Sequence, residues 1–143
     1  MSVLKGHPNV LRLLDVVKNP AVNTYTLVSE YFPHEDFDKY RLNFTPALLK
    51  SYMRELLSTL DFIHSKGIIH RDVKPHNVLF DPSTQKLKII DLGLAEFYHP
   101  EKGMSPRVAS RFFKAPELLM DMEFYNYSID IWSAGIIFAS IVS

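Results

Sequence analysis

The sequence predicts an α+β fold, in which short extended segments and long helical segments occupy separate stretches of the chain. Residues 10–17 and 25–32 are rich in β-branched, leucine and aromatic side chains, as strands are. Residues 46–66 repeat apolar side chains at spacings of three and four, which predicts an amphipathic helix. A further apolar run covers residues 129–142. The 143 residues are enough for one domain with a sizeable core.

Turn residues bound both N-terminal strands. A Gly-His-Pro-Asn sequence at 6–9 precedes the first strand, and Asn-Pro-Ala-Val-Asn at 19–23 separates it from the second. Glycine, proline and asparagine favour turns, each for its own steric reason. The short connection therefore predicts an antiparallel pair of strands, 10–17 with 25–32.

The helix at 46–66 has local signals at both ends. Thr45 can cap its first turn, and Pro46 suits the first helical position. A cation at Lys66 and the glycine at Gly67 are typical of a helix C-terminus. The predicted buried stripe comprises Leu49, Tyr52, Met53, Leu56, Leu60 and Ile63.

The C-terminal half predicts one further hairpin and one further helix. Residues 78–80 and 87–90 are short apolar runs on either side of an Asp-Pro-Ser-Thr turn. Residues 91–117 show little periodicity and predict a long functional loop. Ser128 is the predicted N-cap of a buried helix that starts just after it. That helix has about 14 residues in its apolar run, fewer than the roughly 20 needed to span a bilayer.

Composition and charge exclude several classes of function. Lys plus Arg and Asp plus Glu both total 16, so the net charge is zero. This balance gives no support to nucleic-acid or membrane-surface binding, and we expect neither partner. The chain has no cysteine, and its six histidines form no metal-ligand pair on one helix face. The N-terminus lacks the apolar run of a signal peptide, so we expect a soluble protein of the nucleus and cytoplasm.

Four motifs with chemical meaning follow one another along the chain. Residues 70–77 fit the pattern H-R-D-x-x-x-x-N, residues 91–93 fit D-x-G, and residues 115–117 read A-P-E. Residues 130–135 fit D-x-W-S-x-G in the last predicted helix. Each motif alone is weak, because an aspartate after a helix or before a glycine is usually a turn residue. Together and in this order the first three are the signature of a protein kinase, and the fourth resembles the core helix of that family.

The residue types in these motifs suit phosphoryl transfer, which needs a positioned nucleophile and neutralised phosphate charge. Asp72 can accept the proton of the attacking hydroxyl, and Lys74 projects the same way and can steady the transferred phosphate. Mg²⁺ prefers hard oxygen ligands, which Asn77 and Asp91 supply. Gly93 allows a sharp backbone turn after the metal ligand.

The segments 73–77, 93–100 and 107–114 resemble the casein kinase II catalytic (alpha) subunit family. The resemblance covers essentially the whole chain. It implies an incomplete protein kinase domain that runs from the end of the family's C-helix to its F-helix. Residues 1–32 would be the last N-lobe strands and the hinge, and residues 33–143 the first, mainly helical part of the C-lobe.

The resemblance also implies an activity, cofactors and partners. Members transfer phosphate from ATP, and often from GTP, to serine or threonine near acidic residues, and they use Mg²⁺. The implied partners are acidic protein substrates and a regulatory beta subunit. By position, Asp72 is the implied proton acceptor, and Asn77 and Asp91 are the implied magnesium ligands. The other implied site residues are Glu30 and Phe32 at the hinge, Leu79 and Ile90 in the adenine pocket, and Arg107, Arg111 and Lys114 for acidic substrates.

Three residues depart from the family's usual pattern. Leu92 stands in place of tryptophan, Ala115 in place of glycine, and Ser29 in place of the gatekeeper phenylalanine. The small Ser29 should open a pocket behind the nucleotide. The 143 residues contain no glycine-rich loop and no V-A-I-K lysine, so we expect little kinase activity from these residues alone.

Two main hypotheses follow from these observations. The first is a serine/threonine kinase of which these residues are a part. The second is a truncated, non-catalytic kinase copy that acts as a binding module or has no function. The intact Asp72, Asn77 and Asp91 favour the first, because a decayed copy need not retain them. An unrelated binding module would have to contain all four motifs by accident.

Overall fold

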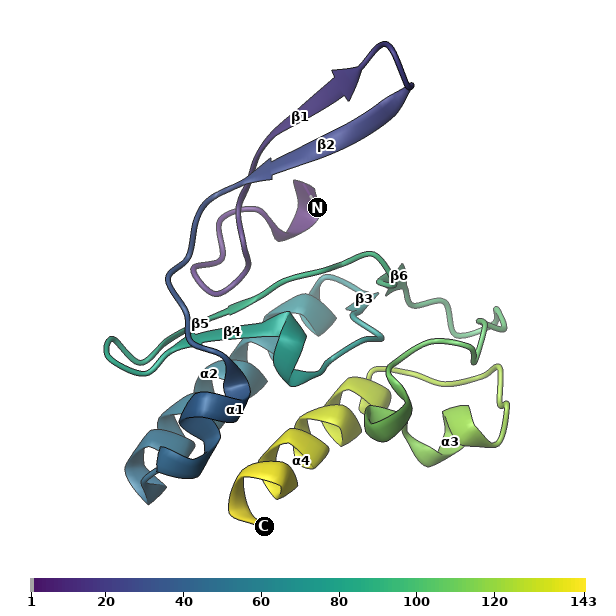
Figure 1. The fold of residues 1–143 in the computed structure, drawn as a ribbon. Helices are drawn as coiled ribbons and strands as arrows, with labels where there is room; N and C mark the ends of the chain where they lie inside the picture. The colour runs from purple at the N-terminus through teal and green to yellow at the C-terminus, as the bar shows by residue number, and fades with distance from the viewer. Residues whose placement is uncertain (1) are drawn as a thin grey trace.

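The computed structural model describes residues 2–143 and shows a β-hairpin that projects from a mainly helical body (Figure 1). The α+β prediction is confirmed. Three two-stranded antiparallel sheets pair β1 with β2, β3 with β6 and β4 with β5. The elements in chain order are η1 (Ser2–Leu4), β1 (Leu13–Asn19), β2 (Thr24–Ser29), α1 (Phe37–Tyr40), η2 (Arg41–Asn43), α2 (Pro46–Ser65), β3 (Ile68–Ile69), η3 (Pro75–Asn77), β4 (Val78–Asp81), β5 (Lys86–Ile89), β6 (Glu96–Phe97), η4 (Arg111–Phe113), α3 (Pro116–Leu119) and α4 (Ser128–Val142).

The projecting hairpin is antiparallel, as predicted, and Leu13 lies opposite Ser29 at its base. The predicted first strand, 10–17, nevertheless begins too early. Val10 forms a parallel bridge with Ile89 of β5, so it belongs to the body and not to the hairpin. Val10 and the following residues of β1 are similarly apolar and β-branched, so the local pattern alone does not show where the hairpin strand begins.

The second predicted strand, 25–32, extends too far. β2 ends just before Glu30, whose N–H donates to the Arg12 carbonyl at 3.0 Å. The chain then runs down to the body, where the Glu35 N–H donates to the Phe80 carbonyl at 3.1 Å. The residues between are an extended connection with no partner strand in the part of the chain that the structure describes.

α2 begins and ends where the sequence predicts. The Thr45 hydroxyl accepts a hydrogen bond from the Leu48 N–H at 3.2 Å and so caps the first turn. At the other end, Gly67 has a φ of 75°, a left-handed conformation that glycine adopts at little steric cost. The buried residues of α2 are Tyr52, Leu56, Thr59, Leu60 and Ile63. The predicted Leu49 and Met53 are half-buried.

The C-terminal half matches the predictions in part. The β4–β5 hairpin is confirmed, with Val78 opposite Ile89. The predicted loop 91–117 contains β6, η4 and the start of α3, and β6 pairs with the distant β3. The prediction that Ser128 caps the last helix is wrong. Ser128 is the first residue of α4, and its N–H donates to Asn126 Oδ1 at 2.8 Å.

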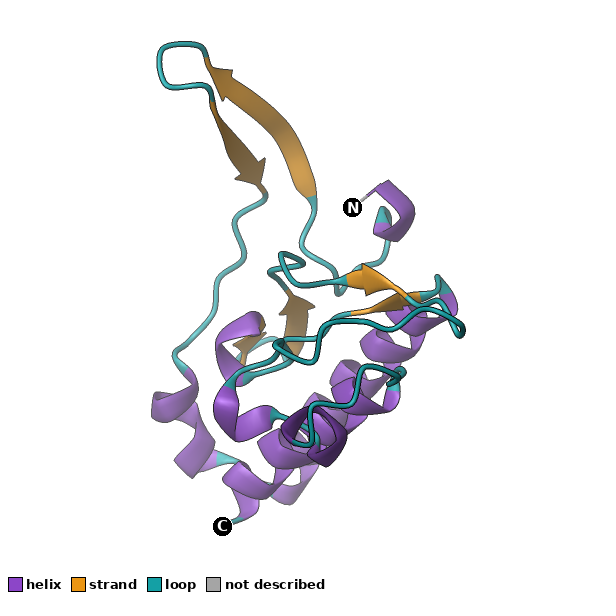
Figure 2. Ribbon diagram, turned by 90° about the vertical axis from the view of Figure 1, so that its right-hand side faces the viewer, coloured by secondary structure: helices purple, strands orange, loops and turns teal. Residues whose placement is uncertain are grey.

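Two apolar clusters fill the body, and Figure 2 shows the helices gathered below the β1–β2 hairpin. The larger cluster joins α2, α4 and the β4–β5 hairpin and includes the fully buried Tyr52, Leu56, Phe80 and Ile137. The smaller one lies around α3 and the start of α4 and includes Ala115. Within residues 2–143, no helix has the length and apolar character needed to cross a membrane.

Candidate active site

The loop of residues 70–77 joins β3 to β4 and is anchored by Asp130, a carboxylate on α4 that is 1% exposed. Asp130 Oδ2 accepts the His70 N–H at 2.8 Å, and Oδ1 accepts the Arg71 N–H at 2.9 Å. His64 Nε2 lies 2.8 Å from Oδ2. These contacts hold Arg71 at a φ of 66°, a left-handed conformation that residues other than glycine rarely adopt.

His70 links this loop to the end of β5. Its fully buried ring accepts the Asp72 N–H at Nδ1, at 3.2 Å, and places Nε2 3.0 Å from the Ile90 carbonyl. Because Nδ1 is an acceptor, the ring proton is on Nε2 and is donated to that carbonyl. The His70 ring therefore links Asp72 to the segment that leads to Asp91.

Asp72 is the centre of a hydrogen-bonded cluster. Its Oδ2 accepts from Lys74 Nζ at 2.8 Å and from Asn77 Nδ2 at 3.0 Å, and its Oδ1 accepts from the Ser110 hydroxyl at 2.9 Å. Lys74 Nζ also donates to Ser110 Oγ at 3.0 Å. The structure therefore brings Asp72, Lys74 and Asn77 together, as the motif predicts, and adds Ser110.

The surroundings of Asp72 favour its charged form. Burial alone would raise the pKa of this carboxyl group, because it removes water from the charge. The hydrogen bonds from Lys74 and Ser110, the charge of Lys74 and the hydrogen bond from Asn77 outweigh burial and hold the pKa below its ordinary value. Asp72 is consequently ionised at neutral pH and able to accept a proton.

Asn77 and Asp91 supply oxygen atoms beside this cluster. The Asn77 amide donates to the Asp72 carbonyl at 2.8 Å, and within residues 2–143 its Oδ1 accepts no hydrogen bond. The Ile90 N–H donates to the Asn77 carbonyl at 3.0 Å, which places Asp91 next to the loop. Asp91 is exposed, and its Oδ1 accepts the Gly93 N–H at 3.2 Å. One amide oxygen and one carboxylate are ligands that fit Mg²⁺.

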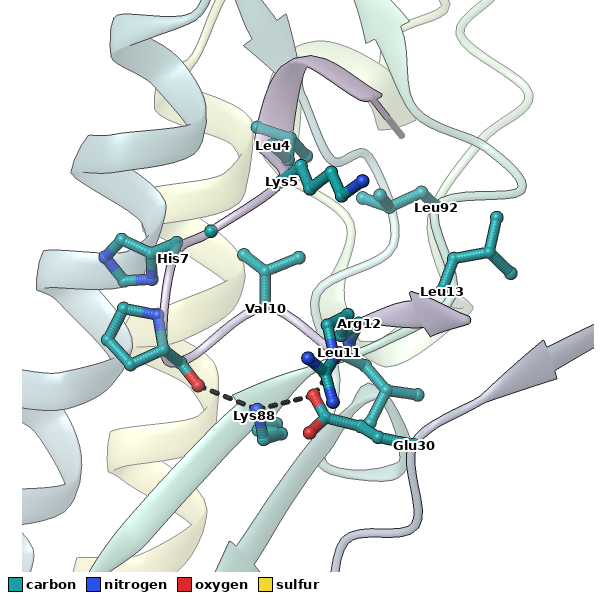
Figure 3. Close-up of a pocket in the computed structure, with 12 residues that line it drawn as sticks. Leu4, Lys5, His7, Val10, Leu11, Arg12, Leu13, Glu30, Lys88 and Leu92 are labelled. Carbon is teal, nitrogen blue, oxygen red and sulfur yellow. Dashed lines mark hydrogen bonds and ion pairs between the residues drawn. The ribbon is translucent and has the colours of Figure 1, made fainter. Parts of the chain in front are cut away.

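The four residues predicted to meet the adenine base do not share one cavity. Glu30 lines a cavity of about 580 Å³ beside the start of β1 (Figure 3). Leu79 lines a second cavity of about 640 Å³ next to α1, and Phe32 lines a third of about 450 Å³. Ile90 is half-buried directly after β5. Glu30, Leu79 and Phe32 thus line three separate cavities, and Ile90 lines none of these three.

The three predicted substrate-binding cations lie on the segment before α3. Arg107 and Arg111 are exposed, and Lys114 is half-buried. In the part of the chain that the structure describes, none of the three forms an ion pair. Arg111 directly follows Ser110, which bonds to Asp72. One of the three cations, Arg111, therefore adjoins a residue of the Asp72 cluster, and all three have charge available for a ligand.

Ser110 and Lys88 contact site residues, but the sequence pattern does not reveal them. Ser110 lies 38 residues after Asp72, and no local periodicity connects positions so far apart. Lys88 alternates with buried residues of β5, as an ordinary solvent-facing strand residue does. Its Nζ nevertheless lies 2.7 Å from Glu30 Oε1. The only sequence signal for either residue is its place inside a segment that also carries predicted site residues.

The ionised carboxylate, the adjacent cation and the nearby oxygen ligands are among the parts that a phosphotransferase requires. The family model described as protein kinase domain matches residues 1–143. The chain therefore belongs to the protein kinase family. Members of this family transfer phosphate to protein substrates and generally use ATP and Mg²⁺.

Proposed function

We propose that the chain is part of a serine/threonine kinase of the casein kinase II alpha type, which transfers the γ-phosphate of ATP to serine or threonine in acidic contexts. The observation that carries the proposal is the cluster in which Lys74, Asn77 and Ser110 all bond to the Asp72 carboxylate. The resemblance adds GTP as a second phosphate donor, a regulatory beta subunit as a partner, and the nucleus and cytoplasm as the location.

Asp72 is the proton acceptor in this mechanism. Its lowered pKa keeps the carboxylate ionised, so it can orient the substrate hydroxyl and take its proton as the oxygen attacks phosphorus. The donors on Lys74, Asn77 and Ser110 hold the carboxylate in one orientation. A fixed acceptor lowers the entropy cost of reaching the in-line geometry.

Lys74 provides positive charge next to the reacting hydroxyl. Its ammonium group bonds to Asp72 and Ser110 and has a third N–H to offer a transferring phosphate. Asn77 and Asp91 would hold Mg²⁺, which neutralises charge on the phosphate oxygens when bound. In this mechanism Asp72 accepts the proton, and Asn77 and Asp91, on two adjoining segments, would bind the metal.

The unpaired cations before α3 support acidic substrates. A single exposed ion pair contributes at most about 1 kcal/mol, so no one of Arg107, Arg111 and Lys114 would select a peptide by itself. Acting together on several carboxylates, they would contribute about 1–3 kcal/mol, a preference of about 5- to 150-fold. The non-catalytic alternative has less support, because a copy without activity has no need to retain Asp72, Asn77 and Asp91.

Asp72→Asn in the full-length protein tests the proposal. The amide keeps the shape of the side chain but cannot take the proton, so transfer from Mg-ATP to an acidic serine peptide should fall about 10²- to 10⁴-fold. Mg-nucleotide binding, measured by calorimetry, should stay nearly unchanged. Asp61→Asn, an exposed residue on α2, is the matched control and should keep wild-type turnover.

Asp91→Asn separates the metal role from the proton role. This change removes negative charge where the metal would bind, so it should weaken Mg-nucleotide binding as well as turnover. Equal loss of nucleotide binding in Asp72→Asn and Asp91→Asn would contradict the assigned roles. A wild-type protein that transfers no phosphate to either an acidic or a neutral peptide would contradict the proposed function itself.

A further inference from the structure

Lys88 is a half-buried cation at the point where the hairpin meets the body. It lies on β5 between two buried residues, and its side chain is 14% exposed. Its Nζ donates to the Pro8 carbonyl at 2.8 Å and to Glu30 Oε1 at 2.7 Å (Figure 3). One ammonium group therefore joins β5, the turn before β1 and the residue that follows β2.

Glu30 is held on both sides. Its Oε1 also accepts the Arg12 N–H at 2.8 Å, and its own N–H donates to the Arg12 carbonyl at 3.0 Å. The hydrogen bond from Lys88 is the largest influence that lowers the pKa of Glu30 below its ordinary value, so the carboxylate is charged at neutral pH. The Lys88 ammonium also lies 5.8 Å from the centre of the Phe32 ring.

Few other side chains tie the hairpin base to the body. The backbone contributes the Leu11 N–H to Ile89 carbonyl bond at 3.1 Å and the Ile89 N–H to Asn9 carbonyl bond at 2.7 Å. Both bonds lie on the β1 side of the hairpin. Within residues 2–143, the ion pair with Glu30 is the one that joins the β2 side to β5.

We propose that Lys88 is a positioning residue for the nucleotide, because it holds the connection at 30–32 at a fixed distance from the segment that ends in Ile90 and Asp91. This inference rests on the proposed function and on the roles that the resemblance implies, with Glu30 and Phe32 at the hinge, Ile90 in the adenine pocket and Asp91 as a metal ligand. Lys88 contacts both Glu30 and Phe32, and it lies on β5 two residues before Ile90. These contacts, and the bond to Pro8, include none of Asp72, Lys74, Asn77 and Asp91.

The test uses the full-length protein with Lys88→Met, Lys88→Arg and Glu30→Gln. Methionine keeps much of the aliphatic packing but removes the charge and the donors. Arginine keeps both, with enough donors to reach Pro8 and Glu30 together. Lys86→Met is the matched control, because Lys86 is an exposed lysine on the same strand. The readouts are KM and kcat for ATP, and amide hydrogen exchange without nucleotide.

The expected result is a rise of about tenfold in the KM for ATP in Lys88→Met, with kcat nearly unchanged, a change of about 1.4 kcal/mol in binding. Glu30→Gln should produce a similar rise, and the double variant should add little to it. Lys88→Arg should restore KM to within about threefold of the wild type. Without nucleotide, amides of 30–35 should exchange faster in Lys88→Met, whereas amides of α2 should not change.

Three results would overturn the inference. The first is a Lys88→Met protein that matches Lys86→Met in KM and in exchange at 30–35. The second is a fall in kcat and thermal stability with KM unchanged, or no recovery in Lys88→Arg, since either shows a structural role alone. The third is a wild-type protein that binds no nucleotide, which overturns the proposed function as well. Nucleotide binding by the wild type therefore separates failure of the inference from failure of the function.

Discussion

The loop of residues 70–77 and the β1–β2 hairpin are held in place by different means. The loop has little regular structure, but its residues bond to Ser110 and to the buried Asp130 of α4, which His64 of α2 also contacts. The hairpin has a backbone ladder with one irregularity between Leu13 and Asp15, yet every residue from Leu14 to Ser29 is exposed. A two-stranded hairpin without a packed face is marginally stable at best. Regular secondary structure is therefore a poor guide to where this molecule is most constrained.

The difference in anchoring between the loop and the hairpin can be tested most directly at Asp130. Asp130→Ala would leave the buried His70 N–H and the partly buried Arg71 N–H without this acceptor, so we expect a loss of about 3–5 kcal/mol in the free energy of unfolding. Asp15→Ala, in the exposed hairpin, should cost less than about 0.5 kcal/mol. Urea titrations of both full-length variants would measure the difference. Similar losses at the two positions would show that the loop is no better anchored than the hairpin.

The cations before α3 should have the next largest effect. The triple variant Arg107→Ala, Arg111→Ala and Lys114→Ala should reduce the preference for an acidic over a neutral peptide by about 5- to 150-fold. The measurement is the ratio of kcat/KM for the two peptides, and the preference should also weaken as salt increases. Lys50→Ala, an exposed position on α2, is the control. An unchanged ratio in the triple variant would show that these cations do not read substrate charge.

Ser110→Ala should have a smaller effect that depends on pH. Its hydroxyl stabilises the charged form of Asp72, so its removal should raise the pKa of that carboxyl group. Activity needs the ionised form, and the acid limb of the kcat/KM profile should therefore move to higher pH. Because the pKa of Asp72 is lower in the folded state, its charge stabilises the fold above the unfolded-state pKa of about 4, and this stabilisation is lost as pH falls through the folded-state pKa. Near neutral pH, the variant should therefore lose about 1 kcal/mol in the free energy of unfolding.

Ser58→Ala, at an exposed position on α2, is the matched control for this experiment. It should leave the pH profile and the free energy of unfolding unchanged. An acid limb that stays in place in Ser110→Ala would mean that the Ser110 hydroxyl does not influence the titration of Asp72.

The smallest effect is expected in the hairpin itself. Leu27 is 61% exposed, so Leu27→Ala should change the free energy of unfolding by less than about 0.5 kcal/mol. A loss above about 2 kcal/mol in the full-length protein, which is typical of a buried leucine, would show that another part of the protein covers this face. Thermal unfolding of the variant and the wild type would decide between the two outcomes.

Local signals predicted the elements whose causes are local. Thr45, Pro46 and Gly67 act within one turn of the helix ends, and both ends of α2 are where these residues predict. The β4–β5 hairpin likewise follows from two short apolar runs around a turn. The error at Val10 has a non-local cause. Val10 pairs with Ile89, which is 79 positions away, and not with the hairpin.

The candidate site was predictable to the extent that a motif carries it. Asp72, Lys74 and Asn77 lie within six residues, and the structure brings them together as the motif predicts. Ser110 and Lys88 were missed, because their contacts join segments that only the folded chain brings together. The separate cavities beside Glu30, Phe32 and Leu79 also depend on how three segments pack, and no pattern in a single segment specifies that packing.

The anchor on Asp130 has a consequence for the order in which the chain acquires its shape during synthesis. Asp130 lies 60 residues after His70, so the backbone geometry around Asp72 has no anchor when residues 70–77 leave the ribosome. At a synthesis rate of about 5–20 residues per second, this interval is about 3–12 s. During that time α2 can form from its own capping signals, whereas residues 70–77 lack the anchor that Asp130 provides. The newly made chain therefore passes through a period in which α2 can be folded while the loop around Asp72 is not yet anchored.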